Sequence, residues 1–312
     1  MKQRISYVFP VYNEQENISL FYAALIAATK KIERTYSLEF IFVNDGSRDA
    51  SLEKLYDLRN SDARVKIINF SRNFGHQLAI TAGMDHSTGD AVIVMDADLQ
   101  DPPAVSLDLI TAWQNGYHVA YAQRRTRQDT LFKRFTATLY YRLMRKLSRI
   151  EIPLNVGDFR LIDRRVVEVL RECREQNRYV RGLVSFAGFK QKAVLFDRAK
   201  RQHGESSYPL SKMIKLALDG LTSFSDAPLK LAGLLSALSI GLAFLGVLYV
   251  IYMKAFHPEA TVPGWSLLMI VMLFMNSMQM LLIGIIGQYT GRIYTETQRR
   301  PLYIIQDKIG IE

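Results

Sequence analysis

Two long uncharged stretches near the C-terminus constrain this chain more than any other feature. One runs from Leu231 to Met253 and the other from Trp265 to Thr290, and neither contains Asp, Glu, Lys or Arg. A helix crosses the hydrocarbon core of a bilayer with about 20 apolar residues, so both are long enough. The connection between them, 254–264, contains Pro258 and Pro263 and is typical of a turn. The sequence therefore predicts a two-helix transmembrane hairpin, with a pair of buried core helices as the alternative.

The distribution of basic residues predicts the orientation of this hairpin. Basic residues flank both stretches, and the connection holds only Lys254 and His257. The flanking residues are Lys212, Lys215 and Lys230 on one side and Arg292, Arg299, Arg300 and Lys308 on the other. By the positive-inside rule both chain ends are cytoplasmic, in an integral protein of the inner membrane. The apolar run Ile5–Phe9 is too short to be a signal peptide.

Charge and cysteine content narrow the partners and the compartment. The net charge of +10 suits anionic partners, and the predicted spans favour nucleotide phosphates and membrane lipid over nucleic acid. The single Cys173 allows no internal disulfide, as expected in a reducing compartment. We expect an N-terminal cytoplasmic domain and five further segments. They are the domain 1–207, an amphipathic juxtamembrane helix 208–228, spans 229–253 and 265–290, an external loop 254–264 and a cytoplasmic C-terminal tail 291–312.

Strand-like and helix-like patterns alternate along the N-terminal domain. Five apolar runs predict strands, namely Ile5–Phe9, Leu38–Val43, Val65–Phe70, Ala91–Met95 and His118–Ala122. Four intervening segments are long enough for helices, namely Glu16–Thr35, Ser51–Asn60, His76–His86 and Pro103–Asn115. Such alternation predicts an α/β fold with a doubly wound, mostly parallel sheet.

Two later segments have apolar residues on one helical face with basic residues interleaved or nearby. They are Leu131–Arg149 and Tyr208–Ser225, and the second leads into the first uncharged stretch. A basic amphipathic helix can lie in the headgroup layer of a membrane, where each Lys or Arg adds about 1 kcal/mol on anionic lipid. The alternative for each segment is a core-facing helix with a solvated basic side.

Paired carboxylates follow the strand Ala91–Met95. Asp96 and Asp98 lie one residue apart at its carboxyl end, the edge of an open α/β sheet where ligands bind. Such a pair repels itself unless a cation lies between, and Mg²⁺ or Mn²⁺ with a substrate phosphate is the usual occupant. A solvated acidic turn is the alternative.

The first two predicted strands also end in polar residues. Asp45, in the turn Asn44-Asp45-Gly46, is placed to accept a hydrogen bond from a nucleobase or ribose, and an Asx turn explains the same residues. No GxGxxG fingerprint is present, so a dinucleotide cofactor is not indicated. His76, His86, His118, His203 and His257 show no paired metal-ligand spacing, and only His203, in the predicted loop, is a candidate worth testing.

Five ordered motifs together resemble a known family. They are Val8–Glu14, Val43–Asp49, Asn73–Gln77, Met95–Pro103 and Gly157–Arg160. With the terminal hairpin they resemble the polyisoprenyl-phosphate glycosyltransferases of family 2, which have the GT-A fold. Bactoprenol glucosyltransferases and dolichol-phosphate mannosyltransferases are its best-known members. Thr222–Ser225 and Gln288–Tyr294 resemble the bactoprenol branch.

The resemblance implies a donor site for a UDP-sugar. In it Asp45 reads the uridine, and Pro10, Tyr12 and Glu14 line the base and ribose pocket. Asp96 lies near the donor sugar or the metal, while Asp98 and Gln100 hold Mg²⁺ or Mn²⁺ on the diphosphate. Arg201 belongs to a mobile loop that closes over the diphosphate, where Ser207 replaces the usual lysine.

The resemblance also implies an acceptor site for polyprenyl phosphate. Arg124 and Arg134 align with the acceptor-phosphate arginines, with Thr138 nearby, and a solvated surface charge is the alternative for each arginine. Asp158 matches the family's candidate base. A phosphate monoester is already ionised at neutral pH, so Asp158 can instead orient the acceptor or stabilise positive charge on the sugar. Its alternative roles are structural, as a helix cap near Asp163 or a partner of Arg160.

The sequence therefore predicts an inverting, metal-dependent glycosyltransferase at the cytoplasmic membrane face. It would move a sugar, with glucose or N-acetylglucosamine the first candidates, from UDP to undecaprenyl phosphate for later modification of a surface glycan. The resemblance implies a homotetramer, and Asn276 and Gln279 would suit helix–helix contacts. Two alternatives remain, a processive polysaccharide synthase of the same fold and a non-catalytic nucleotide-sugar-binding subunit of a lipid-linked sugar flippase.

Overall fold

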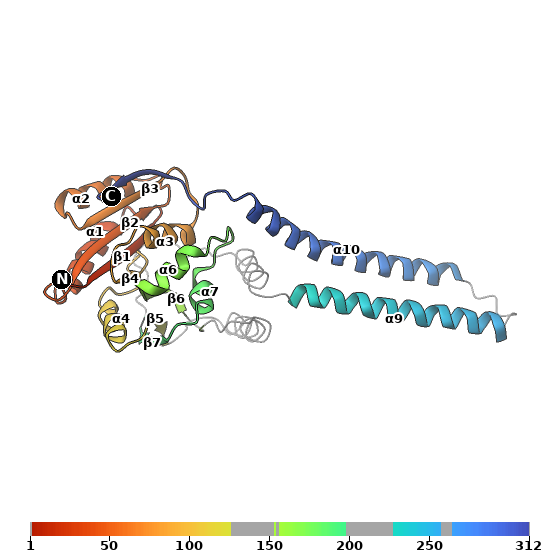
Figure 1. The fold of residues 1–312 in the computed structure, drawn as a ribbon. Helices are drawn as coiled ribbons and strands as arrows, with labels where there is room; N and C mark the ends of the chain where they lie inside the picture. The colour runs from red at the N-terminus through yellow and green to blue at the C-terminus, as the bar shows by residue number, and fades with distance from the viewer. Residues whose placement is uncertain (1, 126–152, 154–155, 198–226, 257–263, 312) are drawn as a thin grey trace. The chain divides into compact units, whose positions relative to one another are not determined.

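The computed structural model describes residues 2–125, 153, 156–197, 227–256 and 264–311 (Figure 1). These residues fall into two compact units. The first is an α/β unit that includes residues 300–311, and the second consists of two long helices. The predicted amphipathic segments 131–149 and 208–225 lie outside the described residues.

A mixed eight-stranded sheet organises the α/β unit. Its strands are β1 (Arg4–Val11), β2 (Ser37–Asn44), β3 (Val65–Phe70), β4 (Ala91–Val94), β5 (Val119–Arg124), β6 (Val156–Asp163), β7 (Gln191–Phe196) and β8 (Ile305–Ile309). Their order is β7-β5-β6-β4-β1-β2-β3-β8. Among the described strands, β1 pairs in parallel with β2 and β4, β2 with β3, and β5 with β7. Strand β6 is antiparallel to both β4 and β5, and β8 is antiparallel to β3.

Helices cover both faces of this sheet (Figure 1). They are α1 (Ile18–Thr29), α2 (Ser51–Ser61), α3 (His76–Asp85), α4 (Val105–Gln114), α6 (Arg164–Glu172) and α7 (Val180–Phe186). Apolar residues of α1, α2 and α4 join the main core cluster. Helix α3 packs on β1 and β2, and α6 packs beside α3 on β4 and β6. A Cβ at Gly83 of α3 would overlap the Val8 side chain, so a residue without a side chain lets this helix approach the sheet.

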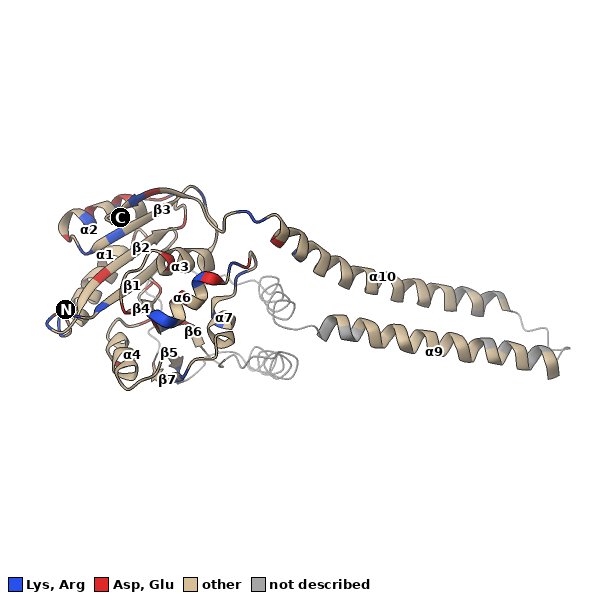
Figure 2. Cartoon of the chain, in the orientation of Figure 1, with Lys and Arg blue, Asp and Glu red and all other residues tan. Residues whose placement is uncertain are grey.

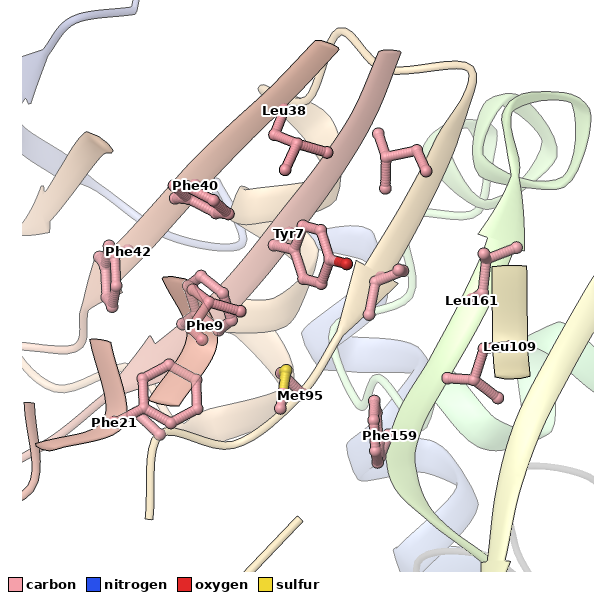
Figure 3. Packing of buried hydrophobic residues seen from close by; sticks show 14 of the residues in the cluster. Tyr7, Phe9, Phe21, Leu38, Phe40, Phe42, Met95, Leu109, Phe159 and Leu161 are labelled. Atoms are coloured by element: carbon pink, nitrogen blue, oxygen red, sulfur yellow. The ribbon is translucent and has the colours of Figure 1, made fainter. Parts of the chain in front are cut away.

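Aromatic side chains fill the core on the α1 face (Figure 3). The Phe9 ring lies 4.7 Å from that of Phe42 and 5.0 Å from that of Phe21, between ring centroids. Tyr7 and Phe40 continue the same layer, and all five side chains are fully buried. Burying an aromatic side chain contributes about 1.5–3 kcal/mol, so this layer holds the sheet and the helices on this face together.

The observed order of strands both confirms and extends the predicted fold. All five predicted strands form, as β1–β5, and all four predicted helices form, as α1–α4. The sheet is mixed rather than mostly parallel, because β6 inserts between β4 and β5. Strands β6, β7 and β8 were not predicted. Their charged residues, such as Asp158 and Arg160 in β6, interrupt the apolar runs on which the prediction depended.

The second unit consists of α9 (Ala227–Phe256) and α10 (Gly264–Thr297). The sequence of α9 has Lys230 and Lys254 near its ends and no charged residue between them, and Figure 2 shows α10 with charge only near its C-terminal end. Among the described residues, one helical segment, Val271–Thr297, is long and apolar enough to cross a membrane, and Ala232–Gly246 is a shorter apolar stretch. One of the two predicted spans thus meets the length and hydropathy criteria, and the hairpin stays a prediction.

The residues that follow α10 return to the α/β unit. Strand β8 pairs with β3, and the Ser71 amide donates to the Ile304 carbonyl at 3.1 Å. Just before β8, the Tyr303 ring stacks on Phe70 with centroids 5.2 Å apart, and its hydroxyl donates to Asp85 Oδ2 at 2.8 Å. The predicted C-terminal tail therefore contains an edge strand of the sheet.

We expect Tyr303 to anchor this returning segment. Tyr303→Ala should lower the free energy of unfolding of the α/β unit by about 2 kcal/mol, because a stacked, half-buried ring is lost. Tyr303→Phe keeps the ring and removes one hydrogen bond, for a loss of about 1 kcal/mol. Chemical denaturation of the purified protein measures both. An Ala variant as stable as the wild type would show that the segment is not anchored there.

Candidate active site

The carboxyl ends of the parallel strands gather the acidic residues at one edge of the sheet. Asp45 follows β2 and Asp96 follows β4, while Asp158 lies near the start of the antiparallel strand β6. Because Val94 of β4 is paired with Arg160 of β6, the end of one strand lies beside the start of the other. The antiparallel pairing of β4 and β6 thus brings the predicted site residues Asp96 and Asp158 together.

Asp45 is almost fully buried and holds the segment that leads into α3. Its carboxylate accepts hydrogen bonds from the Phe74 amide at 2.7 Å, the Gly75 amide at 3.0 Å and Asn73 Nδ2 at 3.0 Å. Burial raises the pKa of Asp45, and the two amide bonds oppose that rise. Both carboxylate oxygens are therefore engaged within the protein, and contact of Asp45 with a nucleotide stays a prediction.

Gly46 explains how Asp45 comes so close to this segment. Its φ of +65° is in the left-handed region, and a Cβ there would lie 2.5 Å from the carbonyl carbon of Arg72. Only glycine meets both demands without strain. The turn after β2 therefore lies directly against the Arg72–Asn73 backbone.

The other predicted nucleotide-site residues lie around the end of β1. Pro10 is a buried strand residue opposite Val43, and Tyr12, just after the strand, is 46% exposed. The Glu14 carboxylate accepts a 2.5 Å hydrogen bond from Asn17 Nδ2. These positions place Tyr12 at the same edge of the sheet as Asp45, with its ring accessible.

Asp96 and Asp98 present oxygens at the same edge. Asp96 Oδ1 is shielded from solvent and has no hydrogen-bond partner, while the Asp96 side chain as a whole is 32% exposed. Burial raises the pKa of Asp96, and the nearby His76 opposes that rise. Asp98 Oδ1 accepts from the Gln100 amide at 3.1 Å, which fixes the turn that bears both predicted metal ligands.

These residues fit a divalent cation that is shared with a bound phosphate. No group of three or more His, Cys, Asp or Glu side chains that would enclose a metal occurs within the described part of the chain. Magnesium is commonly held by one or two carboxylates, with substrate phosphates and water completing its shell. Asp96 Oδ1 accepts no hydrogen bond, although it lies 3.5 Å from His76 Nε2, and with the nearby Asp98 carboxylate it suits that arrangement.

Asp158 is a buried carboxylate surrounded by donors. Arg181 donates through Nε to Oδ1 at 2.8 Å and through Nη2 to Oδ2 at 2.9 Å, and Gln77 Nε2 donates to Oδ2 at 3.1 Å. Burial alone would raise the pKa of Asp158, but the Arg181 charge and the donated hydrogen bonds hold it well below its usual range. The alternative structural roles are not observed, since Asp158 pairs with Arg181 and the α6 cap is Asp163.

His76 lies between the two central carboxylates. Its Nε2 is 3.5 Å from Asp96 Oδ1 and 3.4 Å from Asp158 Oδ2. Burial lowers the pKa of His76, but the Asp158 hydrogen bond and the Asp96 charge outweigh burial and raise the pKa to about 9. His76, which its sequence spacing did not single out, therefore lies between two of the predicted site residues.

Sequence reasoning also missed Gln77 and Arg181. His76 and Gln77 begin α3, and a helix that follows a strand in such a fold begins at the edge where the ligand binds. That position was a usable signal for both residues. Arg181 carried no such signal, because α7 follows α6 in sequence and only the tertiary packing brings it to Asp158.

Two arginines lie beside Gly157, next to Asp158. Arg124, the predicted acceptor-phosphate ligand at the end of β5, has its Nη2 3.7 Å from where a Cβ of Gly157 would lie. Arg160 is 4% exposed and donates from Nη2 to the Gly157 carbonyl at 2.8 Å. Burial lowers the pKa of Arg160 to about 10, against the influence of Asp158. The predicted ligands Arg134, Thr138 and Arg201, together with Ser207, lie outside the described residues.

The β5 and β6 side of this edge is rich in positive charge. Arg124, Arg160 and Arg181 supply three guanidinium groups there against the Asp158 carboxylate, while Asp96 and Asp98 make the β4 side acidic. An anionic group suits the first side and a cation the second.

The fold and this edge define a GT-A-like α/β protein. A profile of the family described as Glycosyl transferase family 2 matches residues 6–171. The chain is 49% identical to a Bacillus subtilis (strain 168) protein named Uncharacterized glycosyltransferase YkcC, over 100% of this chain and 97% of that protein. It is 40% identical to the Prophage bactoprenol glucosyl transferase homolog of Escherichia coli (strain K12), over 97% of this chain and 98% of the relative. The chain belongs to glycosyl transferase family 2.

Two further similarities concern a phage protein and a solved structure. The chain is 40% identical to the Bactoprenol glucosyl transferase of Shigella phage SfV, over 98% of this chain and 99% of that protein. The crystal structure of glucosyl-3-phosphoglycerate synthase from Mycobacterium tuberculosis aligns with a TM-score of 0.46 and 18% identity, over 70% of this chain and 79% of that one.

The raised pKa of His76 predicts a pH-dependent contribution to stability. The folded protein keeps a proton on His76 up to about pH 9, whereas the unfolded chain releases it near 6.5. This contribution is complete below 6.5 and is lost as the pH rises through 9. The stability advantage of the wild type over His76→Gln should therefore shrink between about pH 6 and pH 10. Denaturation with a chelator present measures it, and an advantage independent of pH would contradict the assignment.

Proposed function

We propose that this protein transfers a sugar from a UDP-sugar to a polyprenyl phosphate at the cytoplasmic face of the membrane, with inversion at the sugar carbon. The observation that carries the proposal is the meeting of Asp96, Asp98 and Asp158 at one edge of a family 2 fold. The full-length similarity to proteins named bactoprenol glucosyl transferase supports the lipid acceptor. Glucose is the first sugar to test, and N-acetylglucosamine is the second.

The donor binds at the ends of β1, β2 and β4. Tyr12 offers an accessible ring to the base, with Pro10, Glu14 and Asp45 around it, and Arg201 closes over the diphosphate. Asp98 and Gln100 hold Mg²⁺ or Mn²⁺, and Asp96 lies near the sugar or the cation. A bound divalent cation neutralises negative charge on the departing UDP.

The acceptor phosphate binds on the arginine-rich side, held by Arg124 with Arg134 and Thr138. One of its ionised oxygens attacks the sugar C1, forming the new C–O bond as the bond from C1 to the UDP oxygen breaks on the opposite face. The attacking oxygen is already ionised and carries no proton, so this step needs no base. The low pKa of Asp158 and its surrounding donors favour a fixed negative charge that stabilises the cationic sugar in the transition state.

The path of the chain supports two membrane crossings. Strand β8 follows α10 and pairs with β3, so residues before and after the helical unit belong to one sheet on one side of any membrane. A chain that leaves and returns to the same side crosses an even number of times. If Val271–Thr297 crosses, a second crossing must precede it, and the apolar α9 is the described helix that lies there. An anchor of this kind holds the site at the headgroup level, where the acceptor phosphate lies.

The decisive experiment is transfer by the purified protein. With undecaprenyl phosphate, Mn²⁺ and a panel of UDP-sugars, we expect one lipid product that carries a single sugar. Asp98→Ala should reduce turnover by about 100-fold or more, because the leaving diphosphate loses its cation. Asp108→Ala, an exposed carboxylate on α4, is the matched control and should retain wild-type turnover.

Three outcomes of this experiment contradict the proposal in different ways. A polymeric product indicates a processive synthase. Binding of UDP without any lipid-linked product across the panel indicates a non-catalytic subunit. Full turnover by Asp98→Ala removes the metal assignment and leaves the transfer itself intact. A homotetramer and a flippase partner are further proposals, to be tested by mass measurement and by co-purification.

The hairpin is tested by cysteine labelling in whole cells. In a Cys173→Ser background, His257→Cys should react with a reagent that does not cross membranes, because the loop between the spans lies outside. Gln306→Cys on β8 should react only after permeabilisation. Reaction of both sites in intact cells, or of neither, would rule out this topology.

A further inference from the structure

Asp158 lies on β6, and side chains from two helices, α3 and α7, hold its carboxylate. Helix α3 contributes Gln77 and His76, and α7 contributes Arg181, which makes the bidentate pair. At 6% exposure, Asp158 depends on these donors in place of water. A buried carboxylate without such partners is costly, and removing one partner of a buried ion pair is strongly destabilising.

Gln77 joins the two helices through one amide group. Its Nε2 donates to Asp158 Oδ2 at 3.1 Å, and its Oε1 accepts from the Val180 amide at 3.0 Å. Val180 is the first residue of α7, and its amide has no partner within the helix. The reversed amide would set oxygen against oxygen at Asp158, so these two bonds fix the orientation of the side chain.

The Gln77–Val180 bond also fixes the place of Arg181, the next residue of α7. Gln77 therefore acts on Asp158 twice, directly through its own donor and indirectly through the helix that carries Arg181. Asp45 supports the same arrangement from the other side, because it binds the Phe74 and Gly75 amides immediately before α3. Each of these contacts lies within the α/β unit.

We propose that Gln77 and Arg181 are positioning residues that hold the Asp158 carboxylate in one orientation beside Asp96 during sugar transfer. This inference rests on the proposed function for its kinetic consequence. Neither residue needs to touch a substrate. Their effect reaches the reaction through Asp158, which predicts a loss in kcat with little change in the KM of either substrate.

The first test uses variants that separate the contacts of Gln77. Gln77→Glu keeps an oxygen for the Val180 amide but replaces the donor to Asp158 with a second carboxylate. Gln77→Glu and Arg181→Met should each lower kcat about 10- to 100-fold, with both KM values within about two-fold of wild type. Arg165→Met is the matched control, because it removes a similar arginine–aspartate pair, with Asp163, at an exposed position, and should leave kcat unchanged.

The second test is a double-mutant cycle, which a merely structural role would not satisfy. If Arg181 acts through Asp158, Arg181→Met should lower kcat by less than about two-fold in an Asp158→Asn background. Independent, multiplying losses in kcat, or a loss that falls mainly on the KM of one substrate, would overturn the inference. In the second case Arg181 would be a ligand of that substrate.

A third measurement keeps the test independent of catalysis. Arg181→Met leaves a buried carboxylate without its arginine partner, so it should lower the thermal unfolding temperature, and adding Asp158→Asn should restore part of the loss. If no transfer occurs with any donor, the proposed function fails, while this rescue still tests whether Arg181 serves Asp158. Destabilisation that Asp158→Asn does not relieve would contradict the proposed role of Arg181 in holding Asp158.

Discussion

Repulsion between carboxylates at one edge of the sheet is the constraint on which this structure depends. Asp96 and Asp158 come from neighbouring strands, and His76 Nε2 lies about equally far from both. Two negative charges so close together raise each other's pKa unless cations intervene. His76 and Arg181 supply that compensation, so α3 and α7 must begin at this edge for the site to exist.

The same constraint explains how distant parts of the chain are connected. The segment from Asn73 to Gln77 binds Asp45 at its start and Asp158 at its end, so one short stretch joins the β2 side of the edge to the β6 side. Hydrogen bonds therefore connect Asp45 to Asp158 through the start of α3. The C-terminal residues return to the same sheet as β8, which connects the chain beyond α10 to the domain that bears the site.

The strands β1–β5 and the site residues at their ends could be predicted from local sequence. Apolar runs identify β1–β5, and the polar residues that follow them include Asp45 and Asp96, which do meet at one edge. The insertion of β6 has no local signature, because nothing in its sequence specifies antiparallel pairing between β4 and β5. Arg181 and the bridging position of His76 follow from that insertion, and so sequence reasoning missed them. Strand β8 was not predicted, because the polar residues Gln306, Asp307 and Lys308 are typical of a solvated tail.

In the proposed function, this acidic edge binds a nucleoside diphosphate through a divalent cation. Calorimetric titration of the purified protein with UDP, with and without Mn²⁺, tests it most directly. We expect Mn²⁺ to strengthen UDP binding at least about ten-fold in the wild type and to have no effect in Asp98→Ala. Equal affinity for UDP with and without Mn²⁺ in the wild type would contradict the account.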